Sequence, residues 1–477
     1  GNDCAYSVGG ETYLYNVGAN AYLDAGASWG THAALKSPGF KVDVTMSNGK
    51  YVIATPKYNG SNHWFNGNGY VDSGWTEWTY TSVDGQNAGT LQAGNEGNLY
   101  VLAASGMYNV TRSADAPTTN MGWWRFVTDA KRNDVSGATK TTPVELTHKI
   151  NNPRFDDLGD GWQDAPARGG NTGGTNGDAD SYDDRNPCAE HYNKNFNTYQ
   201  TLTGLANGFY TVSVQGFYRE GGFNDAAAKH VAGTESLNAK LYANGQEQPL
   251  MSIFEGAGKA TGGGTATATG IDGEFPNNMA AASFFFSANL YWNSVTVAVT
   301  DGTLTIGVKK DTAVGADWTI FDNFRVQYLG GVCNSAIPLP HNGNINADQW
   351  YKYTVALDGD YIITAGTAAD IIQTNNGIQF EDEATGDAIT TGTVALTAGT
   401  VIYYKSTTDN TLTIEPASYE YEVSEATTDI AYIQPGNTVT VSFTATTNSG
   451  EAPTQVRTVI AITTNSRGNE HDKTLII

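Results

Sequence analysis

The sequence predicts an all-β protein built from several domains. Its 477 residues exceed the ~100 to 200 residues of one typical domain, so we expect three or four separately packed cores. Gly contributes 55 residues and Tyr 26, while only 16% of the residues are charged. Long helices need more Leu, Glu, Lys and Ala, whereas short strands joined by Gly and Asn turns suit this composition.

Net charge limits the partners that the protein can bind, and the cysteine spacing limits the metal sites and disulfides that it can form. The formal net charge is -23, a sign that repels a phosphate backbone, so we expect neither nucleic acid nor an anionic membrane as a partner. No run reaches the roughly 20 apolar residues that span a bilayer. Cys4, Cys188 and Cys333 lie far apart, which indicates neither a zinc site nor a disulfide-dense scaffold. One disulfide plus one free thiol remains open.

A threefold recurrence marks the first predicted domain, residues 5–130. Aromatic-led starts at Tyr13, Tyr51 and Tyr100 are followed by strand-like endings, with start-to-end spacings of 27, 27 and 24 residues. Three equivalent lobes that share one barrel core are what a β-trefoil requires. We therefore predict a β-trefoil here, followed by a polar linker.

The opening of this domain, from Tyr13-Leu14 through Tyr22-Leu23 to Trp29-Gly30-Thr31, also resembles ricin-like trefoil modules of secreted bacterial proteins. The resemblance implies sugar sites that combine an Asp early in a lobe with an aromatic platform. This chain lacks the family's Gln-x-Trp signature, and a purely structural role is the alternative for each candidate. The candidates are Asp24 and Trp29 in the first lobe and Trp64 and Asp72 in the second.

Residues 145–330 resemble jelly-roll carbohydrate-binding modules. The resemblance rests on motifs in order, from Asn152-Pro153-Arg154-Phe155-Asp156 through Gly208-Phe209-Tyr210-Thr211-Val212 to the closing Asp317–Phe324 run. Alternating Val and Leu/Ile residues on either side of Asp301-Gly302 predict a hairpin over 295–308. The Gly- and Thr-rich stretch 255–273 is expected to be a flap or a long loop.

One face of the strand that runs from Tyr210 to Arg219 is the leading candidate for sugar contact. Tyr210, Val212, Val214 and Tyr218 share the parity expected of the core. The opposite parity carries Gln215, Phe217 and Arg219, and a pyranose stacks on a ring while its hydroxyls bond amides and guanidinium groups. The alternative is that Phe217 packs beneath a loop and Arg219 is an ordinary surface charge. Tyr192 and Trp292 are weaker candidates.

Asp322 falls among apolar neighbours on the predicted closing strand, where Trp318, Ile320 and Phe324 share its parity. A buried carboxylate needs a partner. Calcium accepts carboxylate oxygens, and the jelly-roll resemblance implies a structural calcium between the first and last strands, held by Asp156 and Asp322. The alternative is hydrogen bonding of Asp322 to backbone amides or to Arg154.

Two smaller β domains are predicted after residue 330. Residues 331–416 resemble the bacterial pre-peptidase C-terminal domain, a small β-sandwich, through Trp350-Tyr351-Lys352-Tyr353 and Gly359-Asp360-Tyr361. Residues 417–477 carry alternating runs that indicate an Ig-like sandwich, short for seven strands. The last apolar run looks like a strand, so further C-terminal domains are expected.

Catalytic motifs are missing from the sequence: there is no Gly-x-Ser-x-Gly, His-Glu-x-x-His or phosphate-binding Gly loop. We therefore expect a noncatalytic extracellular protein that binds a glycan or polysaccharide, or the binding arm of a larger secreted glycoside hydrolase or peptidase. The expected location, secreted or at the cell surface, rests on composition and on the family resemblances, because the cysteines fit either a reducing or an oxidising compartment. The alternative is a structural or adhesive surface protein whose β modules self-assemble into filaments.

Overall fold

The computed structural model has an all-β, multidomain fold. It describes residues 11–476 except 26–30, 94–98, 104–109, 157, 166–171, 174–187, 259–262, 332–335, 368–369, 375–378, 380–385, 419–420, 425–426, 430–439, 449–458 and 467–468. The chain divides into two compact units, Gly1–Gly330 and Gly331–Ile477. Among the described residues, every helix is too short or too polar to cross a membrane.

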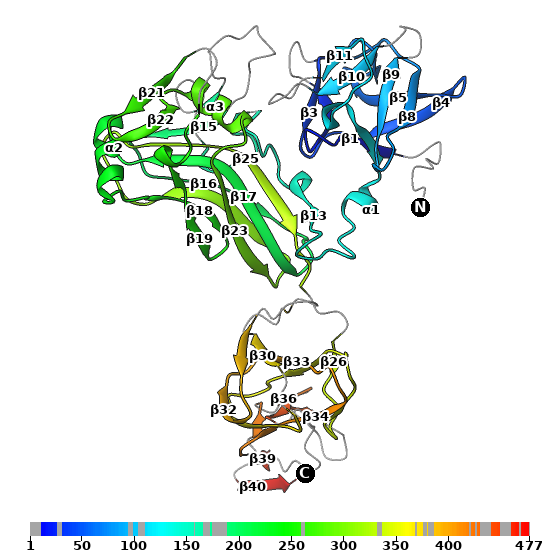
Figure 1. The fold of residues 1–477 in the computed structure, drawn as a ribbon. Coiled ribbons are helices and arrows are strands. Elements are labelled where there is room, and N and C mark those ends of the chain that lie inside the picture. Colours follow the sequence, from blue (N-terminus) through cyan, green and yellow to red (C-terminus); the bar gives the residue numbers. More distant parts are fainter. Residues whose placement is uncertain are drawn as a thin grey trace. The chain divides into compact units, whose positions relative to one another are not determined.

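Residues 11–127 form the N-terminal barrel, drawn in blue and cyan in Figure 1. Its strands are β1 (Glu11–Asn16), β2 (Ala21–Ala25), β3 (Ala33–Lys36), β4 (Val42–Ser47), β5 (Lys50–Tyr58), β6 (Ser61–Phe65), β7 (Val71–Asp72), β8 (Trp78–Ser82), β9 (Gly89–Ala93), β10 (Tyr100–Ala103), β11 (Val110–Ser113) and β12 (Trp124–Val127). A short 3-10 turn, η1 (Asn120–Gly122), precedes the last strand.

Six strands of the barrel close a ring. β1 pairs with β12 and β4, β5 with β4 and β8, and β9 with β8 and β12. The other strands form the hairpins β2–β3, β6–β7 and β10–β11. Each set of four strands makes one lobe, in agreement with the threefold recurrence. Trp78 and Trp124 are fully buried, and their indole N–H groups donate to the carbonyls of Phe65 and Val101.

Residues 144–328 form a two-sheet sandwich. Its strands are β13 (Val144–Glu145), β14 (Thr172–Gly173), β15 (Cys188–Tyr192), β16 (Phe196–Leu202), β17 (Gly208–Arg219), β18 (Ala239–Ala243), β19 (Gln246–Pro249), β20 (Met251–Ser252), β23 (Trp292–Val299), β24 (Leu304–Lys310) and β25 (Trp318–Tyr328). One sheet has the order β14-β15-β25-β17-β20, with β13 on β25 and β23 on β17. The other has the order β16-β24-β18-β19.

The core between the two sheets contains the predicted inner parity of β17, Tyr210, Val212 and Val214. The predicted hairpin over 295–308 is wrong, because β23 pairs with β17 whereas β24 pairs with β16 and β18. The Asp301-Gly302 turn carries the chain from one sheet to the other. The two strands lie in facing sheets and direct alternate residues into the same core. Their sequence alternation is therefore the same as that of two strands paired in a hairpin.

A covering lobe packs on the outer face of the first sheet. It consists of α2 (Phe223–Ala232), η3 (Ile253–Glu255), the hairpin β21 (Thr265–Ala268) and β22 (Ile271–Pro276), and α3 (Met279–Ser287). Figure 1 shows these elements gathered at one end of the sandwich. A second hydrophobic cluster, which includes Phe217, Phe275 and Phe285, joins the lobe to the sheet. The expected flap over 255–273 therefore contains β21 and the first residues of β22. The far end of β22 is buried at Phe275.

The second unit holds another two-sheet arrangement. One sheet has the order β26-β28-β33-β30-β31 and the other β27-β34-β29-β32. Tyr361 and Tyr404 are buried in the core between them. These strands are β26 (Ile337–Pro338), β27 (Asn344–Ile345), β28 (Tyr351–Thr354), β29 (Gly359–Ala365), β30 (Asp370–Thr374), β31 (Asp387–Ile389), β32 (Gly392–Leu396), β33 (Val401–Lys405) and β34 (Asn410–Pro416).

The remaining described strands of the second unit form separate pairs, β35 with β38, β36 with β37 and β39 with β40. They are β35 (Tyr421–Val423), β36 (Thr427–Thr428), β37 (Val441–Ser442), β38 (Ala445–Thr447), β39 (Val459–Ser466) and β40 (Asn469–Ile476). The predicted boundary at residue 416 and the two module types beyond residue 330 stay predictions.

Candidate functional site

The predicted sugar-facing strip on β17 is covered. Gln215, Phe217 and Arg219 are only 2%, 0% and 8% exposed. Phe217 points away from the inter-sheet core, as the alternation predicts, but it packs against Phe286 of the covering lobe, Tyr291 just before β23 and Trp318 of β25. The expectation of an exposed strip is therefore wrong, because the covering lobe occupies that face.

The polar groups of the strip are engaged inside the protein. Gln215 donates its amide to the carbonyls of Phe286 and Leu290, both at 2.8 Å, so it holds the C-terminal end of α3 on the sheet. Arg219 donates to the carbonyl of Gly221 at 2.9 Å, and its guanidinium lies 5.2 Å from the ring centre of Trp318. These contacts are structural and leave no face for a saccharide.

Tyr192 and Trp292 are exposed, at 50% and 37%, but they do not share a platform. Tyr192 ends β15 and Trp292 begins β23, and β25 and β17 lie between these strands. Three strand spacings of about 4.8 Å separate the two residues by at least ~14 Å. One pyranose ring cannot contact both.

The second lobe of the N-terminal barrel brings the predicted pair Trp64 and Asp72 together. They face each other directly on β6 and β7, and such cross-strand partners have Cβ atoms about 4.5 to 5.5 Å apart. Both side chains are half-buried. Asn66 donates its amide to Oδ1 of Asp72 at 2.7 Å. The carboxylate is therefore oriented by an amide and lies beside an indole side chain.

The loop that joins β6 to β8 presents a second indole. Oδ1 of Asn66 accepts from the backbone N–H of Asn68 at 3.0 Å, and Oδ1 of Asp72 accepts from that of Gly74 at 2.9 Å. Trp75 follows this turn and is 55% exposed. Sequence reasoning missed Trp75; the available signal was an aromatic residue directly after an Asp-Ser-Gly turn.

This arrangement offers the groups that a sugar needs. Oδ1 of Asp72 already accepts two hydrogen bonds, while Oδ2 accepts none from any residue in the described ranges. A carboxylate oxygen of this kind can accept from sugar hydroxyls, and an indole ring can stack on the C–H face of a pyranose. We call Trp64, Asn66, Asp72 and Trp75 the second-lobe site.

The first-lobe candidates are only partly described. Asp24 is half-buried on β2 opposite Ala34, and its Oδ1 accepts from the backbone N–H of Ala25 at 2.7 Å. Trp29 lies outside the described residues, as do Cys4 and Cys333. Cys188 is a buried free thiol.

Asp322 is fully buried, at a β-bulge. The register between β17 and β25 shifts between Ser213 and Gln215, and Asn323 adopts φ +56°. The extra residue reverses the faces of β25, so Trp318 and Ile320 face the covering lobe while Phe324 faces the inter-sheet core. The single parity expected for these residues is therefore wrong.

The bulge places Asp322 close to Asp156. Burial, and then the charge of Asp156, raise the pKa of Asp322 well above its usual range. Oδ1 of Asp322 accepts from the backbone N–H of Asn323 at 2.8 Å, whereas its buried Oδ2 has no donor in the described part of the chain. The alternative of hydrogen bonds from backbone amides is therefore realised at Oδ1 of Asp322 but, within the described residues, not at Oδ2.

The carboxylates of Asp156 and Asp322 suit a cation, because both are negatively charged when ionised and each has a buried oxygen. A calcium ion would also need neutral oxygens, because no group of three or more His, Cys, Asp or Glu side chains suited to a metal occurs among the described residues. Backbone carbonyls could supply such oxygens.

Comparisons with known proteins do not assign the chain to a family. No protein-family model matches it, and no curated protein matches it. Among solved structures it is similar to the crystal structure of Cry35Ab1, with 9% identity and a TM-score of 0.23 over 67% of this chain and 90% of the other. A TM-score this low carries no argument about fold or function. The chain is therefore described by its own architecture, an all-β protein of several domains.

Proposed function

We propose that this chain is a noncatalytic glycan-binding protein and that the second-lobe site contacts the sugar. The observation that carries the proposal is the pairing of Trp64 with Asp72, whose carboxylate Asn66 holds in place. The exposed ring of Trp75 lies on the loop that follows. Stacking area and an oriented acceptor are the two elements of saccharide recognition.

The proposal places the protein outside the cell. A protein that binds a polysaccharide outside the cell, alone or as the binding arm of a larger secreted enzyme, has no need of a catalytic centre. The negative net charge suits neutral glycans better than anionic ones, because sugar carboxylates and sulfates would be repelled. A structural or adhesive surface protein that assembles with itself is the competing function.

Glycan retention by the full chain tests the proposal. On an array of neutral polysaccharides, Asp72→Asn is expected to weaken retention by about 10- to 100-fold, since it replaces a charged acceptor by a neutral amide. Trp64→Ala and Trp75→Ala should weaken it comparably. Trp292→Ala is the matched control, an exposed Trp on the sandwich, and should retain binding.

Thermal unfolding of each variant separates loss of binding from loss of fold. Retention unchanged in a triple variant of Trp64, Asp72 and Trp75 would refute the second-lobe site. Filaments formed by a chain that retains no glycan would instead support the adhesive function.

A calcium ion held by Asp156 and Asp322 is a second part of the proposal. Without a cation, the raised pKa of Asp322 means that the folded state favours the protonated acid. Stability is then highest below the usual carboxyl pKa and falls as pH rises toward the raised value. A bound calcium would replace the proton, so its stabilising effect should grow with pH.

Melting temperatures with calcium or with a chelator test this prediction. We expect calcium to raise the melting temperature more at pH 8 than at pH 5, and Asp322→Asn to remove the difference. Asp72→Asn serves as the control carboxylate and should keep it. An equal calcium effect in wild type and Asp322→Asn would exclude this pair as ligands.

A further inference from the structure

The N-terminal barrel and the sandwich are docked where α1 (Asp129–Arg132), which follows the barrel, meets the 3-10 turn η2 (Thr147–Lys149), which follows β13 of the sandwich. The hydroxyl of Ser37 in the barrel lies 3.0 Å from the carbonyl oxygens of both Thr147 and Ile150. The N–H of Asn152 donates to the carbonyl of Ser37 at 3.2 Å. The two regions therefore share a hydrogen-bonded junction within the first unit.

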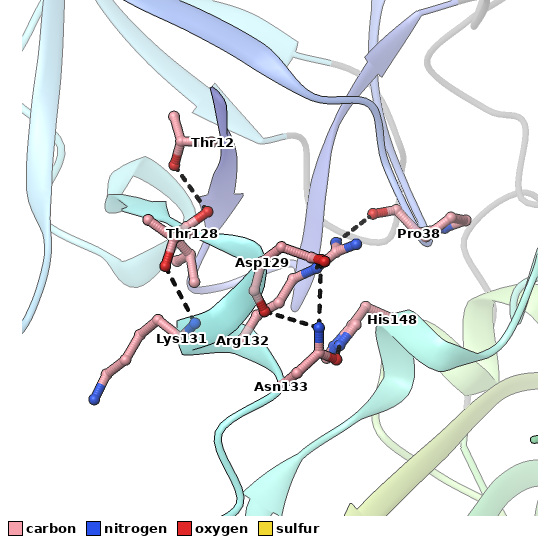
Figure 2. Close-up of polar contacts among 9 residues, drawn as sticks. Thr12, Pro38, Thr128, Asp129, Lys131, Arg132, Asn133 and His148 are labelled. Atoms are coloured by element: carbon pink, nitrogen blue, oxygen red, sulfur yellow. Dashed lines mark hydrogen bonds and ion pairs between the residues drawn. The ribbon is translucent and has the colours of Figure 1, made fainter. Parts of the chain in front are cut away.

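His148 lies in this junction and is 7% exposed. Figure 2 shows it beside Asn133. Its Nε2 is 2.8 Å from Oδ1 of Asn133. The amide nitrogen of Asn133 donates to the backbone carbonyl and to the carboxylate of Asp129, so its oxygen is the atom that faces the imidazole. Nε2 must therefore carry the proton, which leaves Nδ1 unprotonated in the neutral ring.

The charges around His148 are predominantly positive. From α1 come the guanidinium of Arg132 and the carboxylate of Asp129, which pair at 3.1 Å. From η2 comes Lys149. From β2 the ring of Tyr22 meets the imidazole edge-on at 5.9 Å between ring centres. The carboxylate of Asp129 is thus already paired with Arg132. That of Glu145, on β13, accepts from the backbone N–H of Thr147 at 3.3 Å and pairs with Arg325 at 2.6 Å.

Arg132 itself ties the junction to the barrel. Its guanidinium lies 3.5 Å from the ring centre of Tyr13 and 5.0 Å from that of Tyr22, and it donates to the carbonyl of Pro38 at 2.9 Å. It cannot move away from His148 without losing these contacts. A positive charge on the imidazole would therefore meet a fixed cation in a buried place.

We propose that His148 is an acid-sensitive latch: protonation of its Nδ1 separates the N-terminal barrel from the sandwich while both remain folded. Burial, then the charges of Arg132 and Lys149, lower the pKa of His148 to about 3 in the docked state. A released His148 regains an ordinary pKa near ~6.5, so docking is complete above that pH and is lost as pH falls toward 3. The docking equilibrium weakens by about tenfold for each pH unit in this window.

Small-angle X-ray scattering of the full chain between pH 8 and pH 4 tests the latch. The wild-type radius of gyration should rise as pH falls through this window, with near-UV circular dichroism still native. His148→Gln keeps an N–H donor for Asn133 but cannot be protonated, so it should stay compact at every pH. The second unit is common to both proteins, so it does not affect the difference between them.

Two further variants make the result decisive. Lys149→Gln removes a neighbouring positive charge, which raises the pKa of docked His148, so the barrel and the sandwich should separate less completely at the acid end of the window. His191→Gln is the matched control, because His191 is another buried imidazole with a pKa lowered to about 3, inside the sandwich and away from the junction. In the His191→Gln protein the barrel and the sandwich should separate over the same pH range as in wild type. Identical scattering of wild type and His148→Gln down to pH 4, or expansion only together with loss of the native dichroism, would overturn the proposal.

Discussion

Replacing Phe217 with alanine is expected to destabilise the sandwich by about 3 to 5 kcal/mol. The ring is fully buried, with its centre 4.9 Å from that of Tyr291 and 5.3 Å from that of Trp318. Truncation would leave a cavity between the sheet and the covering lobe, and both would lose packing contacts. Urea unfolding followed by tryptophan fluorescence measures the loss. Glycan retention under native conditions should persist, because the second-lobe site belongs to the barrel.

Phe209→Ala is the matched control for this prediction. Phe209 lies on the same strand and is only half-buried, so its truncation should cost clearly less. Equal destabilisation by the two variants would contradict the assignment of Phe217 to a packed interface. Loss of glycan retention in a fully stable Phe217→Ala protein would restore the original interpretation of this residue.

The sequence was sufficient to predict which side of β17 faces the core, because strand alternation depends only on local spacing. It could not predict what covers the other side. The covering lobe comes from segments between residues 223 and 287, and one of them is rich in Gly, Thr and Ala and reads as a loop. The burial of Gln215 and Arg219 depends on these distant segments, which a local pattern does not reveal.

The second-lobe site was predictable in part. Trp64 and Asp72 were candidates by their place in a lobe, and the register of β6 and β7 then sets them face to face. Trp75 carries no periodic signal, because an isolated aromatic residue after a turn does not distinguish an exposed ring from a buried one. The bulge at Asp322 was also hidden, since one extra residue reverses the faces of a strand without changing its composition.

Removing one partner of the Lys310–Asp317 ion pair should have a comparably large effect. The sequence did not single out this pair, in which both side chains are 1% exposed and Lys310 Nζ contacts Asp317 Oδ2. Tyr218 donates its hydroxyl to the same oxygen at 2.9 Å. Asp317→Asn leaves an ammonium without a counter-charge in a dry site, so we expect a loss of about 3 to 5 kcal/mol, measured by urea unfolding of the sandwich.

Two controls separate the pair from ordinary surface charge. Glu247→Gln breaks exposed ion pairs with Lys240 and Lys309, and it should cost no more than about 1 kcal/mol. The double variant Lys310→Met/Asp317→Leu removes both buried charges, so it should be more stable than Asp317→Asn alone. If instead the double variant were no more stable than Asp317→Asn, burial of an unpaired charge could not be the cause of the loss.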